Sequence, residues 1–204
     1  MDIQTIMRMG PVIPVLVIED AAHAAPIAAA LVAGGLRVLE VTLRTPAAPA
    51  AIAAMSRVEG ALVGAGTVLN AADVRRSAEA GARFLVSPGL TEPLARAAAK
   101  SGLPFLPGVA GAGDIMRGLE LGLDHFKFFP AEAAGGRAAL KSLAGPFAQA
   151  RFCPTGGISE ANAPDWLATP GVLCVGGSWL VPPGAPDLAA IEARARTAAG
   201  WARS

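Results

Sequence analysis

The chain has 204 residues and a net charge of +1; 53% of its residues are hydrophobic and only 16% are charged. This length suits one domain with a large core, and the near-neutral charge without a Lys/Arg-rich block argues against nucleic acid or an anionic membrane surface as a partner. Gly, Pro, Arg or Glu interrupts every apolar stretch before it reaches the roughly 18 residues that a membrane span requires.

Short apolar runs follow one another along the chain at intervals of about 25 residues and indicate β-strands. These runs lie at residues 12–17, 36–42, 61–65, 83–86, 104–107, 124–129, 150–154 and 172–176. Ala-rich stretches of good helix formers separate them. Glycines mark where several of these helices are expected to end: Gly34 with Gly35, Gly81, Gly102 and Gly122.

Eight alternations of strand and helix predict an α/β fold, a single (β/α)8 TIM barrel. No linker or shift in composition divides the chain, so we expect one domain over residues 1–204. Its N-terminal segment, residues 1–10, should contain a short helix at residues 2–9, and residues 11–204 should form the barrel. The alternative is a doubly wound open sheet. Gly64-Ala65-Gly66 follows a strand, but the third glycine of a dinucleotide fingerprint is missing and no acidic ribose ligand is well placed.

Two charged residues lie within apolar strands, Glu40 in LRVLEVT and Lys127 in DHFKFF. Side chains alternate along a strand, so Glu40 shares a face with Val38 and Thr42, and Lys127 shares a face with His125 and Phe129. The opposite faces are apolar and suit burial under helices. We therefore expect Glu40 and Lys127 to point into the barrel, toward the carboxyl ends of the strands, where barrel active sites are built.

A structural ion pair is one interpretation of such residues; catalysis is the other. A lysine removed from water can supply a neutral amine near pH 7, and that amine can attack a ketone to form a Schiff base. The iminium withdraws electrons and allows the neighbouring C–C bond to break. A carboxylate such as Glu40 can serve as the general base that takes the proton from the departing hydroxyl.

Candidate anion-binding groups follow the same strands. Arg44 lies four residues after Glu40, where its guanidinium could hold a carboxylate or could be an ordinary loop arginine. Thr67 closes the third strand after Gly64-Ala65-Gly66, where glycines would let a ligand approach the backbone; its hydroxyl could bind that ligand or cap a turn.

Two glycine pairs come at the ends of the seventh and eighth strands. The seventh continues as Thr155-Gly156-Gly157-Ile158-Ser159 and the eighth as Gly176-Gly177-Ser178. The loops after these two strands commonly form a phosphate site in α/β barrels from backbone N–H groups. Together with the internal lysine and glutamate, this phosphate site predicts a phosphorylated keto acid as substrate.

Several segments together resemble one known family. GPVIPVLVIED, GGLRVLEVTLRT, VGAGTVLN, SPGLTEP, FKFFPAE, GPFAQARFCPTGGIS and VLCVGGSWLVP are similar, in register from about residue 10 to residue 185, to the 2-keto-3-deoxy-6-phosphogluconate (KDPG) aldolases and 4-hydroxy-2-oxoglutarate (KHG) aldolases. The resemblance implies a class I aldolase of the Entner–Doudoroff pathway, a lyase without metal or other cofactor that releases pyruvate and D-glyceraldehyde 3-phosphate. It also implies a homotrimer.

The resemblance assigns a role to each matching residue. Lys127 of FKFFP forms the Schiff base, Glu40 transfers protons and Arg44 binds the pyruvyl carboxylate. The remaining substrate-binding residues would be Thr67 and Pro88 in the pyruvyl pocket, Phe129 beside the lysine, and Thr155, Gly156, Gly157, Gly177 and Ser178 around the phosphate.

One segment departs from the family. Residues 109–113 read VAGAG, where the family often carries a threonine and further hydroxyls, so a substrate contact in this loop is in doubt. The last twenty residues also match poorly, but they are typical of an amphipathic Ala-rich helix. The sequence does not discriminate among gluconate-derived, galactonate-derived and unphosphorylated 4-hydroxy-2-oxo acid substrates.

Two other functions would use the same barrel. One is a sugar-phosphate isomerase or epimerase with Glu40 as base and no covalent intermediate; the other is a phosphate-ligand sensor on a degenerate barrel.

The N-terminus lacks the pattern of a secretion signal. Cys153 and Cys174 lie in apolar segments without metal-ligand spacing, which favours reduced core thiols in a cytoplasmic protein with no metal site.

Overall fold

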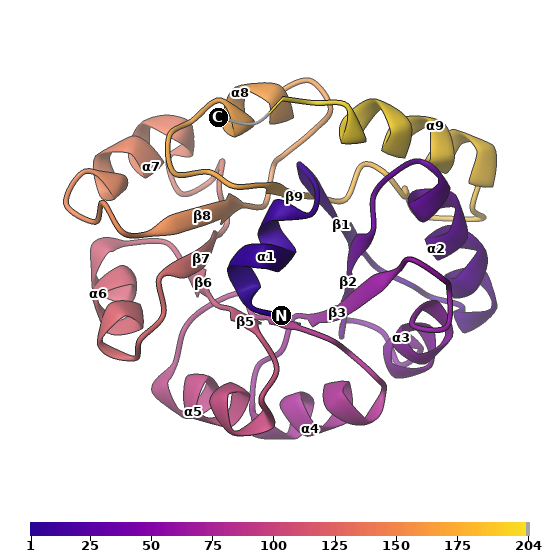
Figure 1. The fold of residues 1–204 in the computed structure, drawn as a ribbon, viewed down its shortest axis with the longest axis horizontal. Helices are drawn as coiled ribbons and strands as arrows, with labels where there is room; N and C mark the ends of the chain where they lie inside the picture. Colours follow the sequence, from indigo (N-terminus) through magenta and orange to yellow (C-terminus); the bar gives the residue numbers. More distant parts are fainter. Residues whose placement is uncertain (203–204) are drawn as a thin grey trace.

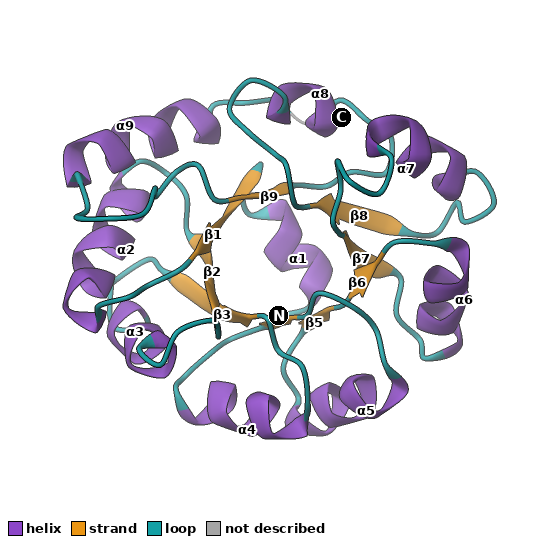
Figure 2. Cartoon of the chain, turned by 180° about the vertical axis from the view of Figure 1, so that it is seen from behind, coloured by secondary structure: helices purple, strands orange, loops and turns teal. Residues whose placement is uncertain are grey.

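A computed structural model describes residues 1–202. Parallel strands are arranged in a ring, and the helices from residue 21 onward lie on its outside (Figures 1 and 2). The strands are β1 (Val12–Leu16), β2 (Val38–Thr42), β3 (Leu62–Gly66), β4 (Leu85–Val86), β5 (Phe105–Leu106), β6 (Gly108–Val109), β7 (His125–Phe128), β8 (Arg151–Pro154) and β9 (Val175–Gly177). Each of the eight predicted apolar runs contains a strand.

Helices lie in the segments between the strands. They are α1 (Ile3–Arg8), the 3₁₀ helix η1 (Ala21–His23), α2 (Ala24–Ala33), α3 (Ala48–Met55), α4 (Ala71–Glu79), α5 (Glu92–Ser101), α6 (Ala112–Glu120), α7 (Gly136–Ala144), α8 (Ala163–Leu167) and α9 (Leu188–Ala199). Glycines with positive φ follow α2, α4, α5 and α6, as the sequence predicts. The helices expected near both ends of the chain are present as α1 and α9.

The strands form two parallel sheets instead of the single eight-stranded sheet that the sequence predicts. Their orders are β5-β4-β3-β2-β1-β9 and β6-β7-β8. Pro107 separates β5 from β6 because proline has no N–H to donate to a neighbouring strand. Its carbonyl still accepts from the N–H of Lys127 at 2.8 Å. On the other side, the isolated bridges Phe152↔Val172 and Thr155↔Gly176 link β8 to β9 and to the residues before it.

The two faces of the strands bury different side chains. Leu39, Val41, Phe126 and Phe128 belong to the large core between strands and helices. Val38, on the opposite face of β2, belongs to a smaller apolar cluster. Both faces are therefore buried, which accounts for the high apolar content and for strands that are apolar on successive residues.

Helix α1 completes the smaller cluster. Ile6 and Met7 of α1 pack there with residues near the amino ends of β1 and β2, Ile13 and Val38. Figures 1 and 2 show α1 lying across the middle of the ring. The cluster also contains Phe84, Val86, Leu106, Cys153, Leu173 and Cys174. Both cysteines are thus buried in the core, as the sequence predicts.

Asp2 begins α1. Its carboxylate accepts a hydrogen bond from the backbone N–H of Thr5 at 2.7 Å, the usual arrangement of an N-cap. Hydrogen bonding to Thr5 holds the pKa of the Asp2 carboxyl below its ordinary value of 3.8. The charged form of Asp2 therefore stabilises the start of this helix.

Candidate active site

Glu40 of β2 and Lys127 of β7 meet inside the ring of strands. Lys127 Nζ donates to Glu40 Oε1 at 3.1 Å, although the two residues are 87 positions apart in the chain. Glu40 is 3% exposed and Lys127 is 6% exposed. The alternation of side chains along each strand places them as the sequence predicts, and the structure brings them together as a buried ion pair.

Gly66 makes room for the Glu40 carboxylate. Glu40 and Gly64, like Thr42 and Gly66, are neighbours in the register of β2 and β3. A Cβ at Gly66 would overlap Oε1 of Glu40, and a Cβ at Gly64 would overlap the Phe84 ring. The sequence suggested that these glycines let a ligand approach the backbone. In the structure, the space beside Gly66 is occupied by Glu40 and the space beside Gly64 by Phe84.

The remaining residues predicted for the pyruvyl pocket lie at or after the carboxyl ends of the strands. Phe129 directly follows β7, and the centroid of its ring is 5.3 Å from Lys127 Nζ. Thr67 directly follows β3 with φ +57°, a left-handed conformation that a β-branched residue adopts only under strain. Pro88 follows β4, and Gly108 is packed against its carbonyl oxygen.

Arg44 lies two residues beyond β2 and is exposed. Within residues 1–202, its guanidinium forms no ion pair. Thr45, the next residue, fixes this loop by donating its hydroxyl hydrogen to the carbonyl of Ile18 at 2.6 Å. The structure does not bring Arg44 into contact with Lys127, but it leaves a free cation at the same end of the strands.

The two glycine loops lie side by side at this end. The bridge between Thr155 and Gly176 joins them, and a Cβ at Gly176 would overlap the Thr155 hydroxyl. Gly156 and Gly157 have φ of +98° and +79°, which favours glycine at both positions. Gly177 is packed against the Trp179 ring, and Ser178 is exposed. The predicted phosphate-binding residues are therefore neighbours in space.

Sequence reasoning missed three side chains that hold the first of these loops. Glu132, Asn162 and Trp166 form a hydrogen-bonded group beside Gly157. The segment FKFFPAE contained Glu132, but neither spacing nor alternation predicts that its carboxylate would face a helix 30 residues later.

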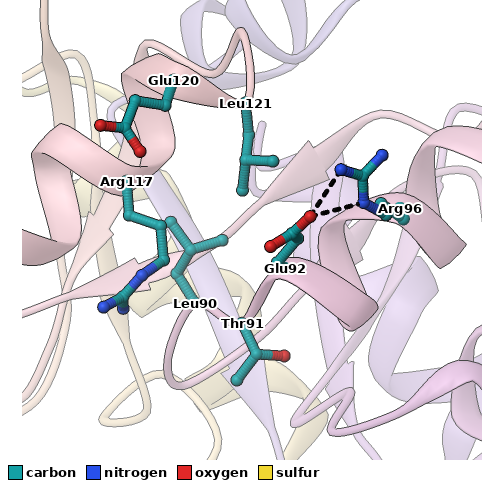
Figure 3. A pocket seen from close by; sticks show the side chains of 7 residues that line it. All are labelled: Leu90, Thr91, Glu92, Arg96, Arg117, Glu120 and Leu121. Carbon is teal, nitrogen blue, oxygen red and sulfur yellow. Dashed lines mark hydrogen bonds and ion pairs between the residues drawn. The ribbon is translucent and has the colours of Figure 1, made fainter.

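A hollow on the outside of the molecule is separate from this site. Figure 3 shows it between α5 and α6, with Glu92 and Arg96 joined by a hydrogen bond of 2.8 Å. Its other lining residues are Leu90, Thr91, Arg117, Glu120 and Leu121. Neither Glu40 nor Lys127 reaches it.

Residues 1–202 contain neither a cluster of metal ligands nor a membrane-spanning helix. No group of three or more His, Cys, Asp or Glu in residues 1–202 is arranged to hold a metal ion. No helix in that part of the chain is both long and apolar enough to cross a bilayer.

Comparison with known proteins identifies the family. Residues 3–194 match the family model of KDPG and KHG aldolases. The chain belongs to this aldolase family. Among its curated relatives is the 2-dehydro-3-deoxy-phosphogluconate aldolase of Zymomonas mobilis, 60% identical over 203 residues, which are 100% of this chain and 98% of that protein. The KHG/KDPG aldolase of Escherichia coli K12 is 57% identical over 180 residues, 88% of this chain and 84% of the relative.

Solved structures of this aldolase family share the fold. A crystal structure of the Zymomonas mobilis ZM4 aldolase with 3-phosphoglycerate has a TM-score of 0.98 at 60% identity, covering 100% of this chain and 97% of the other. The Legionella pneumophila KDPG aldolase has a TM-score of 0.93 at 45% identity, covering 97% and 98%. In that crystal structure pyruvate was captured at low pH as a covalent carbinolamine intermediate.

Proposed function

We propose that this chain is a class I aldolase that cleaves 2-keto-3-deoxy-6-phosphogluconate to pyruvate and D-glyceraldehyde 3-phosphate through a Schiff base on Lys127. The observation that carries the proposal is the buried Lys127 Nζ facing Glu40 in a member of this aldolase family. A Zymomonas mobilis relative with the corresponding name is 60% identical over the whole chain.

The pair supplies both functions that the cleavage requires. The proton of the Lys127 ammonium can pass to Glu40 along the 3.1 Å hydrogen bond, leaving an amine that attacks the C2 ketone. Loss of water from the carbinolamine gives an iminium. Glu40 gives the proton that it took from Lys127 to the departing hydroxyl, which leaves as that water. The Glu40 carboxylate then takes the proton of the C4 hydroxyl as the C3–C4 bond breaks, and the bonding electrons move toward the iminium nitrogen.

Protonation of the resulting enamine at C3, followed by hydrolysis, releases pyruvate and returns Lys127 to its free form. The iminium itself is the electron sink, so this route uses no metal and no other cofactor. An isomerase with Glu40 as base and Lys127 only as electrostatic support is not favoured by the named relatives.

Two subsites at the carboxyl ends of the strands would hold the substrate. Arg44 is assigned the carboxylate, because its guanidinium is exposed and not paired within residues 1–202. Thr67, Pro88 and Phe129 would surround the pyruvyl group. The phosphate is assigned to the two adjacent glycine loops, with Thr155, Gly156, Gly157, Gly177 and Ser178.

4-Hydroxy-2-oxoglutarate is a second candidate substrate. It has the same pyruvyl half and the same bond to be broken, and relatives named KHG/KDPG aldolase are 57% identical to this chain. The proposed Schiff-base chemistry acts on that shared half. Cleavage of this substrate would not involve the phosphate subsite.

The architecture and context follow the same proposal. The bridges between β8 and β9 and the direct continuation of β5 into β6 support one closed eight-stranded barrel. We further propose a homotrimer that acts in the Entner–Doudoroff pathway in the cytoplasm, as the family resemblance implies. Sedimentation equilibrium tests the assembly, because a trimer would have about three times the chain mass of 20.4 kDa.

Borohydride trapping tests the central step. Borohydride added with pyruvate should inactivate the protein and attach a reduced pyruvyl group to Lys127, as peptide mass spectrometry would show. Lys127→Met should lose both the label and the turnover, whereas EDTA should leave turnover unchanged. Labelling at Lys100 or Lys141 would refute the assignment of Lys127, and full turnover without a trappable adduct would support the isomerase instead.

A further inference from the structure

Glu132 lies in the segment that follows β7, beside the glycine loop that follows β8. Its backbone N–H donates to the carbonyl of Gly156 at 3.1 Å, and the N–H of Ala131 donates to the carbonyl of Thr155 at 2.8 Å. These two bonds extend the pairing of β7 with β8 beyond the ends of both strands. The segment leading from Lys127 and the proposed phosphate loop are thereby held together.

The Glu132 side chain adds a second connection. Its Oε1 accepts from the indole N–H of Trp166 at 2.8 Å and from the amide nitrogen of Asn162 at 3.4 Å. Trp166 is 1% exposed, and its ring packs against Phe128, the neighbour of Lys127. The carboxylate therefore links α8 to the segment after β7.

Asn162 carries this connection into the glycine loop. Its amide nitrogen donates to the carbonyl of Gly157 at 3.0 Å, and its Oδ1 accepts from the backbone N–H of Ser159 at 2.8 Å. A Cβ added to Gly157 would lie 2.6 Å from Cγ of Glu132, so the side chain of Glu132 also supports this glycine by direct packing.

Such support matters because the loop contains two consecutive glycines. Glycine adopts left-handed and right-handed conformations almost equally, so Gly156 and Gly157 do not by themselves keep their N–H groups in one orientation. A binding site made of backbone N–H groups requires one orientation before the ligand arrives. Glu132, Asn162 and Trp166 supply the contacts that select it.

Glu132 is poorly suited to contact the phosphate itself. Its carboxylate would repel a dianion, and within residues 1–202 it accepts hydrogen bonds from the neutral N–H donors of Asn162 and Trp166. We propose that Glu132 is a positioning residue, which acts through Asn162 and Trp166 to hold residues 156–159 in the conformation that binds the substrate's phosphate. This inference rests on the proposed function, in which these loops bind that group.

Steady-state kinetics of Glu132→Ala on two substrates tests the inference. KM for 2-keto-3-deoxy-6-phosphogluconate should rise about tenfold or more, because the loop loses two hydrogen bonds and its packing partner. The variant should leave the pyruvyl subsite unchanged. We therefore expect kcat on 2-keto-3-deoxy-6-phosphogluconate, KM for 4-hydroxy-2-oxoglutarate and the extent of pyruvate trapping at Lys127 to stay within about twofold of wild type.

Conservative variants separate positioning from charge. Glu132→Gln removes the charge but keeps a carbonyl oxygen for the Trp166 N–H, so it should restore most of the lost affinity. Trp166→Phe removes the indole N–H together with part of the buried ring, and it should raise KM in the same direction. Combined with Glu132→Ala, it should add little, because the two residues act through one hydrogen bond. These two variants also carry the test if Glu132→Ala does not fold, which thermal unfolding would reveal.

Glu160→Ala is the matched control, since it removes an exposed carboxylate beside the same loop and should leave both KM values unchanged. Three results would each overturn the inference: an unchanged KM in Glu132→Ala, an equal rise in KM for both substrates, or an equal rise in KM in Glu132→Gln and Glu132→Ala.

Ser178→Asp distinguishes failure of the inference about Glu132 from failure of the proposed phosphate site. If KM for the phosphorylated substrate rises in Ser178→Asp but not in Glu132→Ala, only the role of Glu132 is rejected. If it rises in neither, the phosphate site is rejected as well.

Discussion

Glu40 and Lys127 form an ion pair inside a mostly apolar set of strands, where each residue compensates the charge of the other. Removing a single charge from water costs several kcal/mol, and a hydrogen bond of 3.1 Å between opposite charges offsets much of that cost. An apolar pair of similar size could fill the same space at no such cost. A buried ion pair at the carboxyl ends of the strands is therefore better explained by chemistry than by stability.

Glu40→Gln should preserve the shape of the site and remove the carboxylate that we propose as its general base. We expect kcat for cleavage to fall by roughly 10²–10⁴-fold, while borohydride still traps pyruvate on Lys127. The measurement is kcat alongside the extent of labelling in the same preparation. Cleavage at the wild-type rate would mean that Glu40 has only a structural role.

How far the sequence predicts individual residues depends on what holds them in place. Alternation along two strands was enough to place Glu40 and Lys127 on interior faces, and the structure adds the hydrogen bond between them, which alternation does not predict. The group of Glu132, Asn162 and Trp166 depends on how a loop and a helix approach each other in space. Neither alternation nor a motif contains that information.

At the scale of elements, the sequence predicted the positions of the strands more accurately than their pairing into sheets. Apolar runs predicted each strand except β6: the run at residues 104–107 ends in Pro107, and pairing resumes beyond it in β6. β5 pairs with β4, and β6 pairs with β7, so this short stretch of chain serves two neighbours. The break depends on which N–H groups face a partner, and an apolar pattern does not specify that.

The two glycine loops allow a test that separates the proposed phosphate subsite from the proposed pyruvyl subsite. Ser178→Asp places a negative charge in the second loop, and Gly157→Val introduces a side chain where φ is +79° and Glu132 lies close. Both changes should raise KM strongly for the phosphorylated substrate and hardly affect 4-hydroxy-2-oxoglutarate. Equal loss on both substrates would indicate that the loops serve the fold, so the phosphate would have to bind elsewhere.

The N-cap of α1 predicts a pH dependence of stability. The pKa of the Asp2 carboxyl is lowered in the folded protein, so the charged cap stabilises the fold above the ordinary value of 3.8, and this contribution is lost as the pH falls through the lower folded pKa. The difference in Tm between wild type and Asp2→Ala should therefore shrink below pH 3.8. Asp2→Asn is the control: it keeps a capping oxygen without a titrating group, so its advantage over alanine should persist in acid.

At the scale of the whole molecule, α1 joins the start of the chain to the apolar cluster in the middle of the ring of strands. Met7 is fully buried in the cluster that also contains residues of β8 and the segment before β9. Met7→Ala should lower the free energy of unfolding by about 2–5 kcal/mol, as chemical denaturation would measure. Met116→Ala truncates a methionine that is 53% exposed and should change it by about 0.5 kcal/mol or less. Equal effects of the two substitutions would show that α1 is not anchored in this way.

The position of α1 also has a consequence for synthesis on the ribosome. Its partners Cys153, Leu173 and Cys174 leave the ribosome long after Met7, because they lie near the end of the chain. The first helix therefore lacks these three partners until residue 174 has been translated, at about 5–20 residues per second. Release of the nascent chain before residue 174 would leave that helix without part of its cluster, so incomplete chains should be the form of this protein that chaperones bind and proteases remove first.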